Sequence, residues 1–218
     1  MKILLVSATE REIEPLLKKI TIVRDGGAAL RICRYKKMDV DVLISGIGMV
    51  STAYSCAKTI SDAYDIALNA GIAGSFRKEI AIGETVNVSY DLFSELGAED
   101  GEKLLSLHEM KLDGEDFVEN RSDIKNAALN SLRKVKGITV NTVHGKESSI
   151  KNIVERFNPD IETMEGAAFL FACKHEGIPC AQIRTVSNYI EKRDRTKWEI
   201  GLSIKNLNET LEKIFSAF

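Results

Sequence analysis

Residues 40–64 read VDVLISGIGMVSTAYSCAKTISDAY and contain one complete unit of an alternating α/β architecture. The apolar run 40–45 is typical of a strand that is buried on both faces. The glycine-bearing stretch 45–51 predicts a tight turn in which two backbone segments pack closely. In residues 51–64 small and apolar side chains recur at helical spacing, and Ser51 can cap the helix. The stretch therefore predicts strand, turn and helix in that order.

The same alternation continues along the rest of the chain. Further strands are expected at 2–8, 66–71, 84–89, 138–143 and 180–187, and further helices at 123–135, 165–177 and 197–217. Strands that alternate with helices indicate an α/β layered domain around a parallel or mixed sheet. With three prolines and no Ser/Gly-rich linker, we expect a single domain over residues 1–218. The polar, acidic segment 91–121 predicts a long loop that is functional or reaches a partner subunit.

The composition argues against several classes of function. Thirty Lys and Arg stand against 32 Asp and Glu, and a net charge of −2 gives no reason to expect a nucleic acid or a membrane as partner. The N-terminal MKILLVSA is too short for a signal peptide, and no stretch approaches the ~18 apolar residues of a spanning helix. The four cysteines lack CxxC spacing and lie in apolar segments. We therefore expect reduced core thiols, no metal site and a cytoplasmic protein.

Two glycine-bearing segments follow predicted strands. SGIGMVS (45–51) has part of a dinucleotide-binding fingerprint, but Ser51 occupies the third glycine position, so NAD binding is not favoured. NAGIAGSF (69–76) predicts a second glycine turn at a strand end. Two such turns along one sheet edge predict a floor for a ribose or an anion. No cofactor is expected.

The order of the segments resembles that of the nucleoside phosphorylase and nucleosidase superfamily, whose members split nucleosides at the glycosidic bond. The resemblance rests on MKILLVSATEREIEPL, LISGIGMVSTAYS, IALNAGIAGSFRKEIAIGETVNVS, IETMEGAAF and RTVSN, in this order. It implies a three-layer α/β/α sandwich with a mixed, partly barrel-like sheet, a small-molecule nucleoside substrate and a homo-oligomer, a dimer or larger. Within the superfamily, residues 95–100, 162–168 and 187–198 resemble futalosine hydrolases, which release hypoxanthine from futalosine in a route to menaquinone.

Cleavage of an N-glycosidic bond passes through an oxocarbenium-like sugar, so the site must hold the ribose, stabilise the departing base and orient a nucleophile. The resemblance assigns Met164 and Glu165 to the ribose; the alternative for Glu165 is a carboxylate that stabilises a helix N-terminus. Glu12 lies where the nucleosidases activate water. Its alternative is an exposed acidic helix start, in which Glu10 and Glu14 would be equivalent to it.

The residues around Glu12 favour water over phosphate as the nucleophile. Phosphate would be repelled where Glu10 and Glu12 crowd together. The superfamily's phosphorylases carry Arg and Ser for phosphate where this chain has Asn69 and Ile72. Ile72 also removes a serine that related nucleosidases keep there, and it is expected, with Gly74 of the same segment, to line the substrate. Arg184 matches the family's arginine near the water; pairing with a carboxylate is its structural alternative.

Asn188 ends the apolar run 180–187 and occupies the place where nucleosidases of 6-aminopurines carry Asp. Its amide can accept a hydrogen bond from N7–H of a departing 6-oxopurine while it donates to O6. Adenine would leave the amide hydrogen facing an amino group, a mismatch that costs roughly 1–3 kcal/mol when buried. Asn188 thus indicates a hypoxanthine-type base, with a turn-forming Asn as the alternative. Arg193 and Trp198 are candidates to hold futalosine's benzoate-like tail, unless they belong to a solvated charge run.

We therefore predict a nucleosidase that cleaves futalosine with water. Glu12 and Arg184 would act on the water, Glu165 on the ribose and Asn188 on the base. A 6-oxopurine nucleoside phosphorylase and a methylthioadenosine/S-adenosylhomocysteine-type nucleosidase are alternatives within the superfamily. A nucleoside-binding sensor without turnover is the alternative from another class. The three histidines are assigned neither to catalysis nor to a metal.

Overall fold

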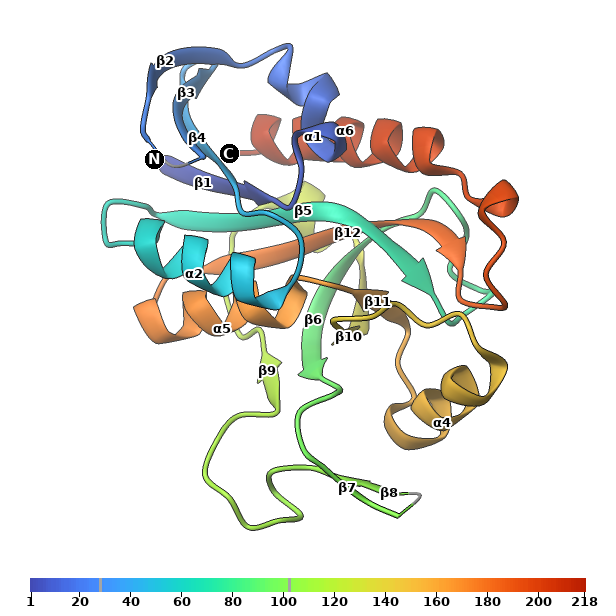
Figure 1. Cartoon of the computed structure of the whole chain (residues 1–218). Helices are drawn as coiled ribbons and strands as arrows, with labels where there is room; N and C mark the ends of the chain where they lie inside the picture. Colours follow the sequence, from blue (N-terminus) through green and yellow to red (C-terminus); the bar gives the residue numbers. More distant parts are fainter. Residues whose placement is uncertain (28, 102) are drawn as a thin grey trace.

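A mixed ten-stranded sheet forms the centre of the computed structural model, which describes residues 1–27, 29–101 and 103–218 (Figure 1). The strands are β1 (Lys2–Ser7), β2 (Thr21–Asp25), β3 (Leu30–Tyr35), β4 (Met38–Ile44), β5 (Ile66–Ser75), β6 (Thr85–Phe93), β7 (Ala98–Asp100), β8 (Lys103–Leu105), β9 (Phe117–Glu119), β10 (Arg133–Thr139), β11 (Ile161–Thr163) and β12 (Cys180–Tyr189). The helices are α1 (Glu10–Leu17), α2 (Met49–Thr59), α3 (Ala127–Asn130), α4 (Glu147–Phe157), α5 (Gly166–Glu176), the 3-10 helix η1 (Arg195–Lys197) and α6 (Ile200–Ser216).

The strand order explains the barrel-like part of the sheet. The order is β11-β10-β6-β12-β5-β1-β4-β3-β2, with β9 on β6 and the short pair β7–β8 apart. Because β11 pairs with β5 as well as with β10, the strands β5, β12, β6, β10 and β11 form a closed circuit. The expected mixed, partly barrel-like sheet is confirmed.

Helices cover both faces of the sheet, as the predicted three-layer arrangement requires. Helices α1 and α6 lie together on one side, and α2 and α5 on the other (Figure 1). Along β1, Ile3 and Leu5 pack in the core beneath α1 and α6, whereas Leu4 and Val6 pack beneath α2 and α5. This alternation is the two-residue period of a strand that is buried on both faces.

The parallel strands bring several chain segments to one edge of the sheet. Strand β1 runs parallel to β4 and β5, and β12 runs parallel to β5. Their carboxyl ends therefore meet, and the residues that follow each strand gather there. The antiparallel pairing of β11 with β5 places Glu162 opposite Gly74 at the same edge.

The predicted helix at 123–135 is wrong. Only residues 127–130 are helical, and β10 begins at Arg133. Strand β10 lies between β6 and β11, so its backbone hydrogen bonds and its buried residues Val135 and Ile138 override the local helical pattern. The strand predicted at 138–143 consequently ends at Thr139.

The predicted glycine turn at 69–76 is also wrong, because β5 continues through Ser75. Glycine is needed there for space. A Cβ on Gly71 would lie 2.1 Å from Nη1 of Arg184, and a Cβ on Gly74 would lie 2.8 Å from Cγ1 of Ile190. Elements absent from the sequence prediction are the β2–β3 hairpin, α1, α4 and β11, and the segment 91–121 contains the short strands β7, β8 and β9.

The four cysteines are all free and buried, as the sequence predicted. In the described ranges no helix has both the length and the apolar character needed to cross a membrane.

Candidate active site

A cavity of about 370 Å³ lies at the sheet edge where the parallel strands end. We call it the glutamate cavity, after Glu12, Glu162 and Glu165, which line it. Of the residues predicted from sequence, it is lined by Glu12, Ile72, Gly74, Met164, Glu165, Asn188 and Trp198. Arg184 and Arg193 are not part of its wall. The fold thus gathers most of the predicted residues in one place.

Glu12 is held firmly at the start of α1. Its Oε2 accepts hydrogen bonds from the backbone N–H of Thr9 (3.1 Å) and from the hydroxyls of Thr9 (3.0 Å) and Ser7 (3.3 Å). This is a capping box, in which the carboxylate binds back to the residue that begins the helix. Oε1 accepts from the backbone N–H of Ile72 at 3.1 Å, so the carboxylate also joins α1 to β5.

The two neighbouring glutamates are not equivalent to Glu12. Glu10 pairs with Arg31 at the surface, and Glu14 pairs with Lys18 at 2.8 Å, more than half exposed. Neither lines the glutamate cavity. Among the three acidic residues of this helix, only Glu12 is turned inward.

Glu165 precedes α5 and is 6% exposed. Its Oε1 accepts from the backbone N–H of Gly48 at 3.1 Å, in the turn after β4, and its Oε2 lies 3.7 Å from Nη1 of Arg184. Burial raises the pKa of Glu165, while the Arg184 charge and the Gly48 N–H oppose that rise. The first glycine segment therefore supports a carboxylate through Gly48 and lines the cavity through Ile47.

Arg184 lies behind the cavity wall with a fully buried side chain. Its Nη2 donates to Oδ1 of Asn69, whose Nδ2 donates to the carbonyl of Val6 at 3.2 Å. The guanidinium packs against Gly71, which has no side chain to displace it. In this position Arg184 orients and partly neutralises Glu165. In the sequence analysis Asn69 served only as a reason why phosphate is not expected to bind. In the structure the Asn69 side chain holds Arg184 in place.

Asn188 reaches the cavity through an irregularity in β12. The register between β12 and β5 shifts between Val186 and Asn188, and such a bulge re-aims the side chains beside it. Its Oδ1 accepts from the hydroxyl of Ser187 at 2.8 Å, and its Nδ2 donates to the carbonyl of Tyr189 at 3.1 Å. An amide oxygen accepts two hydrogen bonds and an amide nitrogen donates two, so one of each remains for a ligand.

The structure adds a buried pair, His144 and Glu162, that the sequence argument missed. His144 lies between β10 and α4, and Glu162 lies in β11; both line the glutamate cavity. Nδ1 of His144 is hydrogen-bonded to Oε2 of Glu162, and the backbone N–H of His144 donates to Oε1 at 3.0 Å. No local sequence pattern marks this pair, because β11 is only three residues long and was not predicted.

The glutamate cavity also has apolar lining residues, among them Ile47, Trp198, Ile200 and Ile204. Arg11, an exposed cation that the sequence analysis did not consider, lines it as well. Arg193 lies instead in a neighbouring cavity of about 280 Å³, the basic cavity. The two cavities share His144, Asn188 and Trp198. The Arg193 guanidinium lies 5.1 Å from the centre of the Trp198 ring.

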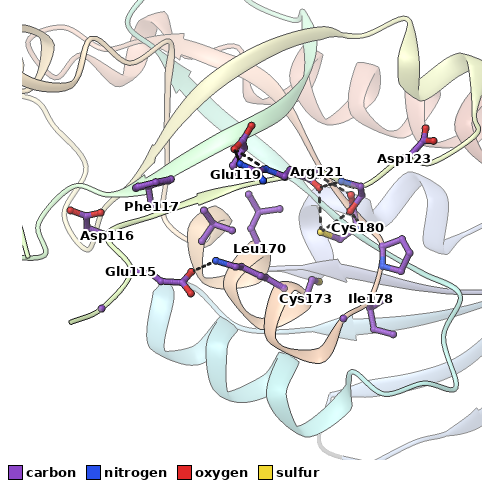
Figure 2. Close-up of a pocket in the computed structure, with 17 residues that line it drawn as sticks. Glu115, Asp116, Phe117, Glu119, Arg121, Asp123, Leu170, Cys173, Ile178 and Cys180 are labelled. Carbon is purple, nitrogen blue, oxygen red and sulfur yellow. Dashed lines mark hydrogen bonds and ion pairs between the residues drawn. The ribbon is translucent and has the colours of Figure 1, made fainter. Parts of the chain in front are cut away.

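A further cavity, of about 680 Å³, lies at the other end of α5 and β12 (Figure 2). We call it the cysteine cavity, because Cys173 and Cys180 line it. Four of its charged side chains form two ion pairs: Lys174 with Glu115 at 2.6 Å, and Arg121 with Glu119 at 2.7 Å. None of the predicted site residues lies there.

The glutamate cavity therefore offers two carboxylates with fixed orientation, an amide with one free donor and one free acceptor, and a histidine. Carboxylates can hold sugar hydroxyls or take a proton from water, and an amide can recognise a heterocyclic base. In the described part of the chain, no group of three His, Cys, Asp or Glu side chains is arranged to hold a metal.

Comparison with known proteins places this site in a family. Residues 2–218 match the phosphorylase superfamily, and the chain belongs to that family. Within it, the chain is 28% identical to a futalosine hydrolase of Streptomyces coelicolor over 80% of this chain and 77% of that protein. It is 27% identical to an aminodeoxyfutalosine nucleosidase of Campylobacter jejuni over 86% of both chains.

Solved structures confirm the fold. A 5′-methylthioadenosine/S-adenosylhomocysteine nucleosidase of Helicobacter pylori superimposes with a TM-score of 0.81 at 19% identity, over 100% of this chain and 99% of that chain. A futalosine hydrolase of the same species superimposes with a TM-score of 0.79 at 20% identity, over 100% and 98%. The predicted nucleoside phosphorylase-like architecture is therefore correct.

Proposed function

We propose that this chain is a nucleosidase that cleaves the N-glycosidic bond of futalosine with water and releases hypoxanthine, a step in menaquinone biosynthesis. The observation that carries the proposal is the meeting of Glu12, Glu165 and Asn188 in one cavity. The curated relatives include futalosine hydrolases of Streptomyces coelicolor and Thermus thermophilus at 28% and 26% identity, which supports it.

In the proposed reaction the ribose lies between the two carboxylates. Glu165, beside Met164, accepts hydrogen bonds from the ribose hydroxyls, and Arg184 holds Glu165 from behind. Glu12 takes a proton from a water molecule whose oxygen bonds to C1′. The bond between C1′ and N9 breaks, and its electron pair leaves with the base. The capping box and the Ile72 N–H keep the Glu12 carboxylate in place for this transfer.

Charge favours water over phosphate as the nucleophile. Glu12, Glu162 and Glu165 all line the cavity, so a phosphate dianion would meet like charges in a partly desolvated site. Arg184 partly neutralises Glu165 from behind the wall but does not line the cavity, so it offers a phosphate no direct contact. A 6-oxopurine nucleoside phosphorylase is therefore the weaker alternative.

Asn188 is proposed to select a base with oxygen at carbon six. After its bonds to Ser187 and Tyr189, the amide retains one hydrogen for O6 and one lone pair for an N–H of the base. An amino group at carbon six would face the amide hydrogen. This distinguishes futalosine from its amino analogue, the substrate named for two further relatives at 26–27% identity.

The apolar wall formed by Trp198, Ile200 and Ile204 is proposed to receive the aromatic tail of the substrate. Two cations are available near this wall: Arg11 lines the same cavity, and the Arg193 guanidinium lies over the Trp198 ring. Either guanidinium suits a carboxylate on the tail.

We further propose that the protein acts in the cytoplasm as a homo-oligomer. Ile47, Val50 and Tyr54, in and before α2, are 61–81% exposed beside the cavity that Ile47 lines. Apolar side chains gathered at a cavity rim suit coverage by a second copy. Light scattering should give a dimer or larger, and Val50→Lys should lower the mass; a monomeric wild type would contradict the proposal.

The test of the proposed reaction is a substrate panel. Futalosine, its amino analogue, inosine and methylthioadenosine are each incubated with and without phosphate, and the released base is identified by chromatography. We expect hypoxanthine from futalosine at a rate that does not depend on phosphate. A phosphate requirement would indicate a phosphorylase, and binding without release of any base would indicate a sensor.

A further inference from the structure

The proposed reaction needs a proton for the departing base, and Asn188 cannot supply it. An amide does not titrate, and both ends of the Asn188 side chain are already bonded to Ser187 and Tyr189. A hypoxanthine that leaves with the electron pair of the broken bond must be neutralised at a ring nitrogen. A titratable group near Asn188 would perform this step, and His144 is the one that meets Asn188 in both the glutamate and the basic cavities.

The His144 ring is fixed by contacts on several sides. Its Nδ1 and its backbone N–H both bind the carboxylate of Glu162, which is 4% exposed. The Phe76 ring meets the imidazole edge-on, with 6.4 Å between centroids. The adjoining loop is held by the Arg193 N–H, which donates to the carbonyl of Gly145 at 3.4 Å. This degree of support is typical of a side chain that must keep one orientation.

These contacts leave Nε2 of His144 available. Glu162 takes Nδ1, and within the described residues Nε2 forms no hydrogen bond. The His144 side chain is 11% exposed and lines the cavity, so its free nitrogen borders the space proposed for the base. An imidazole whose one nitrogen donates to a buried carboxylate and whose other nitrogen faces a ligand has the arrangement of a general acid or base.

We propose that His144 is the general acid of this site, and that Glu162 is its positioning residue; the inference rests on the proposed nucleosidase function. As the C1′–N9 bond breaks, the proton on Nε2 of His144 passes to N7 of the base, and Asn188 holds O6 through its remaining amide hydrogen. Water adds to C1′ and gives its proton to Glu12. The products are neutral hypoxanthine and the free sugar, with Glu12 protonated and His144 neutral until solvent restores both.

Several charged groups line the two cavities that His144 borders. Glu162 in β11 lies against Nδ1, and Glu12 and Glu165 face the same cavity from α1 and the start of α5. The basic cavity adds Lys78, Lys192, Arg193 and Lys197, together with Glu191 and Asp194. A step that needs a proton from a general acid slows as pH rises, so the turnover number should fall on the alkaline side of its optimum.

The test compares His144→Gln with His175→Gln, using the full chain and futalosine. His175 is the matched control, because its Nε2 lies 3.6 Å from Glu115 in another histidine–glutamate pair, away from the glutamate cavity. We expect His144→Gln to lower kcat by about 10²–10⁴-fold, the usual range for a general acid, with KM within a few-fold of wild type. The alkaline fall of the kcat profile should disappear with it. His175→Gln should match wild type both in its kinetic constants and in the alkaline fall of its kcat profile.

A second variant, Glu162→Gln, separates catalysis from folding. The glutamine can still accept a hydrogen bond from Nδ1 of His144, so the melting temperature should stay near that of wild type. The variant should lower kcat less than His144→Gln does and should shift the alkaline limb of the kcat–pH profile. An unchanged kcat in His144→Gln, a rise in KM alone, or an alkaline limb that persists in that variant would each overturn the inference. Failure of the wild type to release a base from any nucleoside would overturn the proposed function instead.

Discussion

The glutamate cavity and the cysteine cavity lie at opposite ends of the same two elements, α5 and β12. Glu165 precedes α5 and Asn188 is the last residue but one of β12 at the first cavity, whereas Cys173 and Cys180 border the second. The cysteine cavity is the larger, about 680 Å³ against 370 Å³. Four of its charged groups form ion pairs, and the side chains of the Arg121–Glu119 pair are 83% and 48% exposed.

The difference lies in how the polar groups are held. At the glutamate cavity, backbone N–H groups of Thr9, Ile72 and Gly48 fix two carboxylates that still face open space. Surface ion pairs such as those at the cysteine cavity contribute little to stability, and their charged groups are bound to each other rather than directed toward a ligand. Size alone therefore does not locate the site; fixed and incompletely satisfied polar groups do.

The largest expected effect concerns Glu12. Glu12→Gln keeps the side-chain shape but removes the base, so kcat for futalosine should fall about 10²–10⁴-fold. Glu10→Gln is the matched control, because Glu10 lies two residues before Glu12 and pairs with Arg31 at the surface; its kcat should stay near that of wild type. Steady-state kinetics measure both. Equal losses in the two variants would mean that α1 acts as a general acidic surface.

A buried carboxyl between the two cavities should give a pH-dependent stability. Asp91 in β6 is fully buried, and a Cβ on Gly166, the first residue of α5, would lie 2.3 Å from its Oδ2. Burial raises the pKa of Asp91 to about 7, from 3.8. The folded state therefore holds this proton at pH values where the unfolded state has lost it, and the free energy of unfolding should fall as pH rises from about 4 to about 7.

Asp91→Asn removes this titration, because the amide resembles the protonated carboxyl. At pH 8 the variant should be more stable than wild type by roughly 1–3 kcal/mol, and its stability should vary less between pH 4 and 7. Urea unfolding at several pH values measures the effect. Parallel stability–pH curves for the two proteins would show that Asp91 is ionised in the folded state.

The smallest effect on catalysis is expected at the cysteine cavity. Cys173→Ala removes a buried sulfur and should lower the free energy of unfolding by about 1 kcal/mol. Activity per folded molecule should not change, because Cys173 lies at the far end of α5 from Glu165. Loss of kcat without loss of stability would show that the two ends of the helix are coupled.

The central strands could be predicted because strands that are buried on both faces consist mainly of apolar residues. β1, β4, β5 and β12 read as apolar runs, since they are covered on both faces. The hairpin strand β2 is exposed throughout and α4 has no buried residue, so neither carries that signal. β10 is held by its two neighbouring strands rather than by its own sequence pattern.

The site residues likewise divide into those that local sequence identifies and those whose placement depends on the pairing of strands. Glu12, Glu165 and Asn188 follow predicted strands or begin predicted helices, so local sequence and the family resemblance suffice to find them. The pairing of His144 with Glu162 depends on β10 and β11 lying side by side, which no local pattern reveals. The placement of Arg184 behind the wall likewise depends on β12 lying beside β5 and on the missing side chain of Gly71.

The central claim is that the amide of Asn188 selects a 6-oxopurine in the glutamate cavity. The most direct test is a competition between futalosine and its 6-amino analogue, with wild type and Asn188→Asp. Wild type should release hypoxanthine faster than adenine by about 5–150-fold, the equivalent of 1–3 kcal/mol, and Asn188→Asp should reduce or invert that ratio. Faster release of adenine by the wild type, or an identical ratio in the two proteins, would contradict the account.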